Sequence, residues 1–364
     1  MSALSNLCNL RNLRLSRVCL GVSLLLTPSP ARSQAETVVT SPSAPVFASR
    51  GRVEGHLALK YSPAGAFSPD SRRLAIMMGE KIALMDLGEG TIGKVMRLRV
   101  GDIFDLEIES ANFLSATSLF VLARGGMQPK GSSFAQRTPL MGFQWSIDQD
   151  TLTGKVNAVG AGGGFDPILY LPHIGYVGMY KESKISLWNP RTGLGTVVAL
   201  QELGHKPGLF AFSPDAHWLL LARVEGNSSP DPMVVDVKQE KFVDVLAGHH
   251  GTVLDMNFSS DGQRLMTACE DGLIRVWQVA DWKLAATLPG HVGPVHAAEF
   301  SPDGKWIVSV GQDKSIRIWS AEDGRLLQTL SESRDPLRAV AFSPDGRYLA
   351  ASSEQNVLVW DRKQ

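Results

Sequence analysis

Hydrophobic and polar residues alternate with a period of two along most of the chain after residue 45, as in Ser315-Ile-Arg-Ile-Trp319. Because successive side chains of a strand point to opposite faces, this pattern predicts short β-strands. Clusters of Gly, Pro, Asp and Ser separate the alternating runs and are typical of turns. No stretch with helical spacing is long enough to matter. The pattern therefore predicts an all-β protein.

The alternating segments also form a repeat. Phe-Ser-Ser-Asp-Gly begins at Phe258, and Phe-Ser-Pro-Asp-Gly begins at Phe300 and Phe342, which gives two spacings of 42 residues. Weaker copies begin at Phe67 and Phe212. Each unit contains four strands, and one sheet of this size cannot bury both of its faces. A ring of such sheets buries them, so the repeat predicts a β-propeller.

The repeat resembles that of the WD-repeat propeller family. Gly-His pairs begin at Gly55, Gly204, Gly248 and Gly290, and Trp277, Trp319 and Trp360 end runs of alternating residues. The resemblance is specific over about 246–361 and holds only at the level of the pattern over 47–245. It implies a buried hydrogen-bonded chain in two units, from indole to hydroxyl to imidazole to carboxylate. The residues of these two structural tetrads are His249, Thr267, Asp271 and Trp277, and His291, Ser309, Asp313 and Trp319.

Seven segments are suitable as third strands, so we expect a seven-bladed propeller of four-stranded antiparallel blades; six or eight blades remain open. The chain ends soon after the third strand that Trp360 closes. Residues 46–56 are the obvious donor of the missing fourth strand, and pairing the two ends would protect exposed edges. We expect a single propeller domain over 46–364.

The first 35 residues have the order of a secretory signal peptide: a basic stretch, an apolar run from Val18 to Leu26, and small residues before Glu36. The run is shorter than the roughly 20 residues of a membrane-spanning helix. We therefore expect a signal peptide over 1–35, a flexible leader over 36–45, and a protein exported to the periplasm or the extracellular space. A mitochondrial or cytoplasmic location is the alternative if residues 1–35 are not a secretory signal.

Charge bears on the class of partner. The chain has 36 basic and 36 acidic residues, but residues 1–35 hold four arginines and no acid, so the remainder has a formal charge of −4. A mildly acidic body is not typical of proteins that bind nucleic acid. We expect a protein or peptide partner, no nucleic acid, and no membrane insertion after signal cleavage.

No catalytic residue, metal site or cofactor is predicted. The histidines and aspartates of the tetrads follow the repeat and not a ligand spacing, so a structural role is favoured over catalysis. The predicted function is a non-catalytic, exported scaffold that binds a protein or peptide. The alternatives are an exported propeller of the TolB kind, or an enzymatic propeller of the lactonase or quinoprotein type.

The resemblance also indicates where a partner binds, because in the family the residue before the tetrad aspartate lies on the face formed by the Gly-His loops. A cationic insertion between two strands, 124–138, should leave the same side of its own blade, and either binds a partner or is a mobile decoration. The candidate partner-binding residues are Glu270, Gln312, His250, Glu182, Arg124, Lys130 and Arg137.

Overall fold

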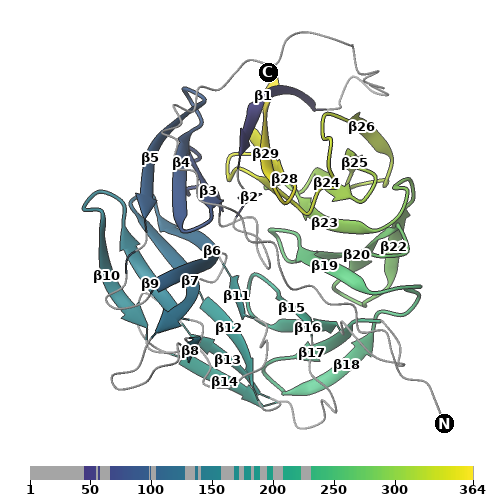
Figure 1. Ribbon diagram of the computed structural model, residues 1–364. Coiled ribbons are helices and arrows are strands. Elements are labelled where there is room, and N and C mark those ends of the chain that lie inside the picture. The colour runs from purple at the N-terminus through teal and green to yellow at the C-terminus, as the bar shows by residue number, and fades with distance from the viewer. Residues whose placement is uncertain are drawn as a thin grey trace, which may run out of the picture.

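The computed structural model describes residues 45–54, 56–57, 66–97, 99, 104–127, 136–137, 141–156, 168–171, 176–181, 184–188, 195–199, 208–222 and 231–363. Within these ranges the regular structure is β-strand throughout, and the strands form seven antiparallel sheets. Figure 1 shows the sheets arranged in a ring. The predicted all-β propeller is confirmed, and the described residues form seven four-stranded or five-stranded sheets, the expected number of blades.

Three blades come from the first half of the chain. One contains β2 (His56–Leu57), β3 (Arg73–Met78), β4 (Lys81–Asp86) and β5 (Thr91–Arg97). The next contains β6 (Phe104–Ser115), β7 (Ser118–Met127), β9 (Met141–Ser146) and β10 (Thr151–Val156), and a short β8 (Gln136–Arg137) also pairs with β7. The third contains β11 (Ile168–Leu171), β12 (Tyr176–Lys181), β13 (Lys184–Trp188) and β14 (Gly195–Ala199).

Three more blades follow in chain order. Their strands are β15 (Leu209–Phe212), β16 (Trp218–Ala222), β17 (Met233–Asp236) and β18 (Lys241–Val245). Next come β19 (Val253–Phe258), β20 (Arg264–Cys269), β21 (Ile274–Gln278) and β22 (Leu284–Leu288). The sixth blade has β23 (Val295–Phe300), β24 (Trp306–Gly311), β25 (Ile316–Ser320) and β26 (Leu326–Leu330).

The last blade joins the two ends of the described chain. It contains β27 (Ala339–Phe342), β28 (Tyr348–Ser352) and β29 (Asn356–Lys363), and its fourth strand is β1 (Val46–Glu54). β1 runs antiparallel to β29, with Val46 opposite Lys363 and Glu54 opposite Asn356. The predicted ring closure by the segment that begins at Val46 is confirmed.

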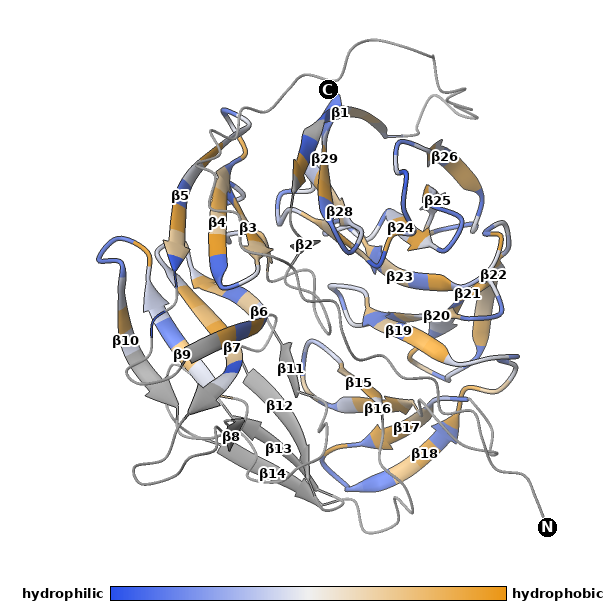
Figure 2. Ribbon diagram, viewed as in Figure 1, coloured by the Kyte–Doolittle hydropathy of each residue, from blue (hydrophilic) through white to orange (hydrophobic). Residues whose placement is uncertain are grey.

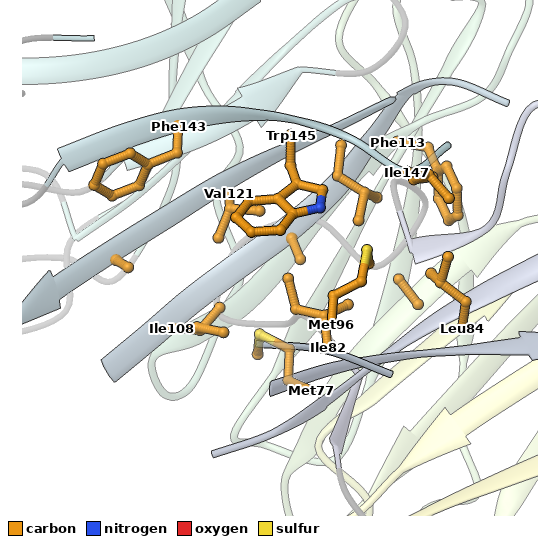
Figure 3. Close-up of a cluster of buried hydrophobic side chains, with 14 of the residues drawn as sticks. Met77, Ile82, Leu84, Met96, Ile108, Phe113, Val121, Phe143, Trp145 and Ile147 are labelled. Carbon is orange, nitrogen blue, oxygen red and sulfur yellow. The ribbon is translucent and has the colours of Figure 1, made fainter. Parts of the chain in front are cut away.

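The hydrophobic core lies between neighbouring blades. In Figure 2 orange residues lie along the coloured strands of adjacent sheets. Figure 3 shows one such layer, where Trp145 and Phe113 of the second blade face Ile82 and Met96 of the first. The sheet of a blade is apolar on both faces, so both faces must be covered. The ring provides a neighbouring blade on each side.

The Ser-Pro-Asp-Gly turns join the first and second strands of the blades. In the β23–β24 turn the buried Ser301 hydroxyl donates to Asp303 at 2.6 Å and accepts from the backbone N–H of Trp306 at 2.9 Å. Gly304 has φ = 68°, a left-handed conformation that favours glycine. The same Ser–Asp bond recurs at Ser68, Ser213, Ser259 and Ser343. The turn chemistry expected from the sequence is thus present in five blades.

Candidate functional site

The β23–β26 blade contains the complete tetrad that the sequence indicated. The indole N–H of Trp319 donates to Ser309 Oγ at 2.9 Å, and Ser309 Oγ lies 2.8 Å from His291 Nε2. His291 Nδ1 lies 3.0 Å from both carboxylate oxygens of Asp313. Ser309 and Trp319 are buried, so each polar group removed from water has a partner.

The carboxylate of Asp313 organises the turn around it. It accepts hydrogen bonds from the backbone N–H groups of Val292 and Ser315, both at 3.1 Å, and from Ser315 Oγ at 2.8 Å. Burial lowers the pKa of His291, which keeps the imidazole neutral. Burial opposes ionisation of Asp313 as well, but these hydrogen bonds and His291 lower its pKa overall. The tetrad therefore fixes the loop that carries Val292.

The β19–β22 blade differs from the expectation at one position. Trp277 Nε1 donates to Thr267 Oγ1 at 3.2 Å, and Thr267 Oγ1 lies 2.8 Å from His249 Nε2. However, His249 Nδ1 lies 2.9 Å from the carboxylate of Asp231, which belongs to the loop before β17 in the preceding blade. The expectation that Asp271 completes this tetrad needs correction. Asp231 lies outside the repeat unit, so the repeat pattern does not point to it.

Asp271 has a different partner because an arginine competes for it. Arg275 Nη2 donates to Asp271 at 2.8 Å and to the carbonyl oxygen of Gly248 at 2.6 Å. Although burial opposes ionisation, the hydrogen bond from Arg275 and those from the backbone of His250 and Leu273 lower the pKa of Asp271 to about 2. Asp271 thus still fixes the turn before β21 and the Gly-His loop, but as the partner of a buried guanidinium.

Four exposed residues lie on these fixed loops: His250, Glu270, Val292 and Gln312. We call the surface that they form the loop face. The loops are held together in pairs, since Glu270 N–H donates to Thr252 O and Gln312 N–H donates to Pro294 O, both at 2.9 Å. Val292 is 76% exposed, the highest value among the large hydrophobic residues that the structure describes as exposed. Sequence reasoning did not select Val292, although it follows a Gly-His pair just as His250 does.

A polar cluster lies at the same end of the neighbouring inner strands. His296, at a β-bulge in β23, has Nδ1 2.7 Å from Leu337 O and Nε2 3.0 Å from Arg338 Nη1. Because the Leu337 carbonyl and the guanidinium require a donor and an acceptor respectively, the ring is neutral with its proton on Nδ1. Burial lowers the pKa of His296 in agreement with this. Arg338 also contacts the exposed carboxylate of Glu354 at 3.5 Å.

The remaining candidate residues are less informative. Arg124 lies near the end of β7 and forms an ion pair with Glu109, so it is already partnered by a carboxylate. Arg137 lies in β8, where it is opposite Gly126 of β7. Lys130 and Glu182 lie outside the described residues. The role of the 124–138 insertion stays a prediction.

Two partly buried carboxylates that sequence reasoning missed connect the inner strands of successive blades. Asp255 in β19 accepts from the backbone N–H of Ala298 in β23 at 3.0 Å. Glu299 in β23 accepts from the backbone N–H of Phe342 in β27 at 2.8 Å. Burial raises the pKa of Asp255 to about 6 and that of Glu299 to about 8. These bonds link strands of adjacent blades, and alternation alone does not reveal them.

The described residues hold neither a metal-binding cluster nor a membrane-spanning helix. No group of three or more His, Cys, Asp or Glu side chains in this part of the chain is arranged to hold a metal ion. No helix there is long and apolar enough to cross a membrane.

Comparison with known proteins adds a family to this geometry. The model of the WD domain, G-beta repeat, matches residues 240–278, 282–320 and 324–361. The chain is also 32% identical over 95 residues to the U5 small nuclear ribonucleoprotein 40 kDa protein of Dictyostelium discoideum. This match covers 26% of the present chain and 26% of that protein, so the chain spans about a quarter of the relative that it matches.

The comparison contradicts the predicted location. By its name the relative belongs to a small nuclear ribonucleoprotein, which points away from a protein exported to the periplasm or the extracellular space. The prediction of export was wrong because it depended on the order of residue types in 1–35, and an apolar run of nine residues is a weak indicator. Residues 1–44, which include the predicted signal peptide and most of the leader, lie outside the described residues.

Proposed function

We propose that the chain, a WD-repeat protein by the match over residues 240–278, 282–320 and 324–361, is a non-catalytic scaffold that binds a protein partner on the loop face. WD repeats generally bind proteins, and the finer assignment to His250, Glu270, Val292 and Gln312 is the proposal. The single observation that carries it is the exposure of Val292 on a loop whose backbone is held by Asp313.

The chemistry of the loop face favours a polar peptide segment with one apolar side chain. Val292 offers an apolar contact, and Gln312, Glu270 and His250 offer hydrogen-bonding groups around it. Interfaces commonly combine an apolar centre with a polar rim. The buried tetrads already hold the loops in place, so binding a partner would cost little free energy for ordering these loops.

The comparison suggests the kind of assembly without identifying a partner. The matched relative is, by its name, part of a ribonucleoprotein. In such a particle the present chain would contact protein and not RNA, because its body is mildly acidic and the loop face carries one carboxylate and no lysine or arginine. We therefore propose a role in assembling a complex through protein contacts.

The proposal is tested by quantitative affinity capture with variants of the loop face. Val292→Asp, Glu270→Ala and Gln312→Ala should each lower the recovery of the same partner, with the largest loss, about tenfold, for Val292→Asp, because it places a charge in an apolar contact. Recovery is measured by mass spectrometry against the unaltered chain in the same extract.

Lys305→Ala is the matched control, because Lys305 is exposed on the β23–β24 turn at the opposite end of the same blade. All four variants should keep the thermal stability of the chain within about 0.5 kcal/mol, as is usual for surface changes. Undiminished recovery with all three loop-face variants would show that the partner binds elsewhere.

The enzymatic and TolB-like alternatives have weaker support. A TolB-like propeller would have six blades without Gly-His pairs, whereas the described sheets number seven and two Gly-His histidines are buried in tetrads. The two raised-pKa carboxylates, Asp255 and Glu299, are each held by a backbone N–H of the next blade, which favours a structural role.

A further inference from the structure

A cationic pocket lies where the closing blade joins β1 to β29. Its volume is about 410 Å³, and its charged lining residues are Arg50, Arg347, Asp361, Arg362 and Lys363. The lining includes four cationic residues and one carboxylate, so its formal charge is +3. We call it the closing pocket. It lies at the end of the closing blade where the β27–β28 turn is, whereas the loop face lies at the opposite ends of the β19–β22 and β23–β26 blades.

The backbone places Arg50 in this pocket by an irregularity. The register of β1 against β29 shifts between Ser49 and Gly51, so Arg50 is the extra residue of a β-bulge. A bulge redirects the side chain of its extra residue, and bulges are common next to functional sites. The guanidinium of Arg50 donates to the carbonyl oxygens of Leu87 and Gly88 in the neighbouring blade.

Asp361 holds two of the arginines together. Arg50 Nε lies 3.5 Å from one oxygen of Asp361, and Arg347 Nε lies 3.3 Å from the other. Both guanidinium groups also lie over the ring of Tyr348, at 5.5 and 5.0 Å from its centroid. One carboxylate and one aromatic ring therefore orient two cations whose charge they offset only in part.

The third arginine is held from the other side of the strand. Arg362 lies over the ring of Trp306 in the neighbouring blade, 5.3 Å from the centroid. Lys363 is exposed and follows it at the end of β29. Stacked arginines lose less conformational freedom when they bind a ligand than unrestrained ones do.

We propose that the closing pocket binds a single phosphoryl group, either on a phosphorylated side chain of a partner or as a free phosphate ion. Guanidinium groups bind phosphate oxygens through paired hydrogen bonds, and a phosphate dianion matches a site of charge +3 better than a carboxylate does. All residues that line the pocket belong to one blade, so the cationic lining is compact and does not form a long stripe. A compact lining favours one phosphoryl group over a nucleic-acid backbone. This proposal is independent of the loop face.

The test is fluorescence anisotropy with a labelled peptide, Gly-Gly-phosphoserine-Gly-Gly, and its unphosphorylated form. The phosphopeptide should bind the full chain at least tenfold more tightly, and Arg347→Gln should remove about tenfold of its affinity because charge-assisted hydrogen bonds are lost. Arg347→Lys should bind with intermediate affinity, since it keeps the charge but not the planar fork. Competition by inorganic phosphate separates the two sources: full displacement at matched ionic strength indicates a site for the ion itself.

Arg325→Gln is the matched control, because Arg325 has a side chain 52% exposed beside Asp323, as Arg347 has one 53% exposed beside Asp361. It should change affinity less than twofold. Lys363→Gln provides a second pocket variant at an exposed position, in case Arg347→Gln lowers the melting temperature. The proposal is overturned if the two peptides bind equally or neither binds, or if both pocket variants bind as Arg325→Gln does. The proposal would also be overturned if a single-stranded RNA bound more tightly than the phosphopeptide and if Arg325→Gln weakened that RNA binding as much as the pocket variants do.

Discussion

The imidazole of His291 is buried with both nitrogens partnered, by Ser309 on one side and Asp313 on the other. In the adjacent blade Asp231 occupies the position of Asp313 as the carboxylate beside the histidine. At the residue scale, stability therefore depends on whether each buried polar atom finds a partner, and less on which residue supplies it. Trp360 shows the limit of this rule, because its indole nitrogen is buried without a described partner in the closing blade.

Removing one member of a complete tetrad should be costly. Asp313→Ala leaves the Nδ1 of His291 and the N–H groups of Val292 and Ser315 without their acceptor, so we expect a loss of about 2 to 3 kcal/mol in the free energy of unfolding. Chemical denaturation measures it. Asp323→Ala, at an exposed turn of the same blade, is the control and should cost less than about 0.5 kcal/mol. Equal effects of the two changes would contradict a structural role for the tetrad.

Glu299 should make stability depend on pH. Burial, together with the charge of Asp255, raises its pKa from 4.5 to about 8, so between these values the folded chain keeps a proton that the unfolded chain has lost. The contribution of this group to stability must then fall as the pH rises from about 4.5 to about 8. Glu299→Gln does not titrate, so the variant should gain stability relative to the unaltered chain over this range. If the melting temperatures of the unaltered chain and of Glu299→Gln changed in parallel with pH, the raised pKa of Glu299 would be refuted.

The elements owe their geometry to turns and bulges that recur from blade to blade. The outermost strands β10, β18, β22 and β26 each have a register shift against the strand inside them. These strands have one unpaired edge, and a bulge twists an edge away from pairing with another chain. β18 depends on this protection, because all five of its residues are exposed, including Phe242, Val243 and Val245.

The Ser-Pro-Asp-Gly turn gives a prediction at this scale. Ser301→Ala removes the acceptor of the Trp306 N–H and a donor to Asp303, and we expect it to cost about 1 to 2 kcal/mol because the hydroxyl is buried. Ser260→Ala, in the exposed second position of the corresponding β19–β20 turn, should cost less, since its hydroxyl contacts only Pro302 O. Urea denaturation compares the two variants. A larger loss for Ser260→Ala would be inconsistent with this account.

The whole molecule depends on the closing blade. Phe47 and Val53 of β1 are buried against Trp360 and Val357 in the layers on either side of this blade. Removing β1 would leave β29 as an unprotected edge and open both of these layers to water.

Deletion of residues 46–54 should therefore destabilise the entire ring by several kcal/mol, through the loss of buried apolar area. Deletion of residues 36–44 removes the same length of chain without touching β1, and should leave the melting temperature unchanged. Calorimetry of both deletions tests the prediction. If the two deletions behaved alike, β1 would not be what closes the ring.

Much of this architecture was predictable because the propeller repeats a local unit. The 42-residue spacing, the period-two alternation and the turn residues each act over a few positions, and together they predicted the strands, the seven blades and the strand at Val46 that closes the ring. The tetrad of Asp313 was predictable for the same reason, since all four members lie in one unit. The location was not predictable in this way, because residues 1–35 are outside the repeat.

Contacts between units were decided only by the tertiary structure. Asp231 reaches His249 from the preceding blade, Glu299 reaches the backbone of the next, and the bulge at Arg50 assembles the closing pocket from the two ends of the described chain. Asp231 and Glu299 have their partners in other blades, and Arg50 meets Asp361 within the closing blade, although the two residues are more than 300 positions apart in the sequence. Local periodicity determines which face of a strand a residue occupies. Only the closed ring determines which distant group lies opposite that residue. Burial at these contacts then shifts the pKa values of titratable groups such as His249 and Glu299.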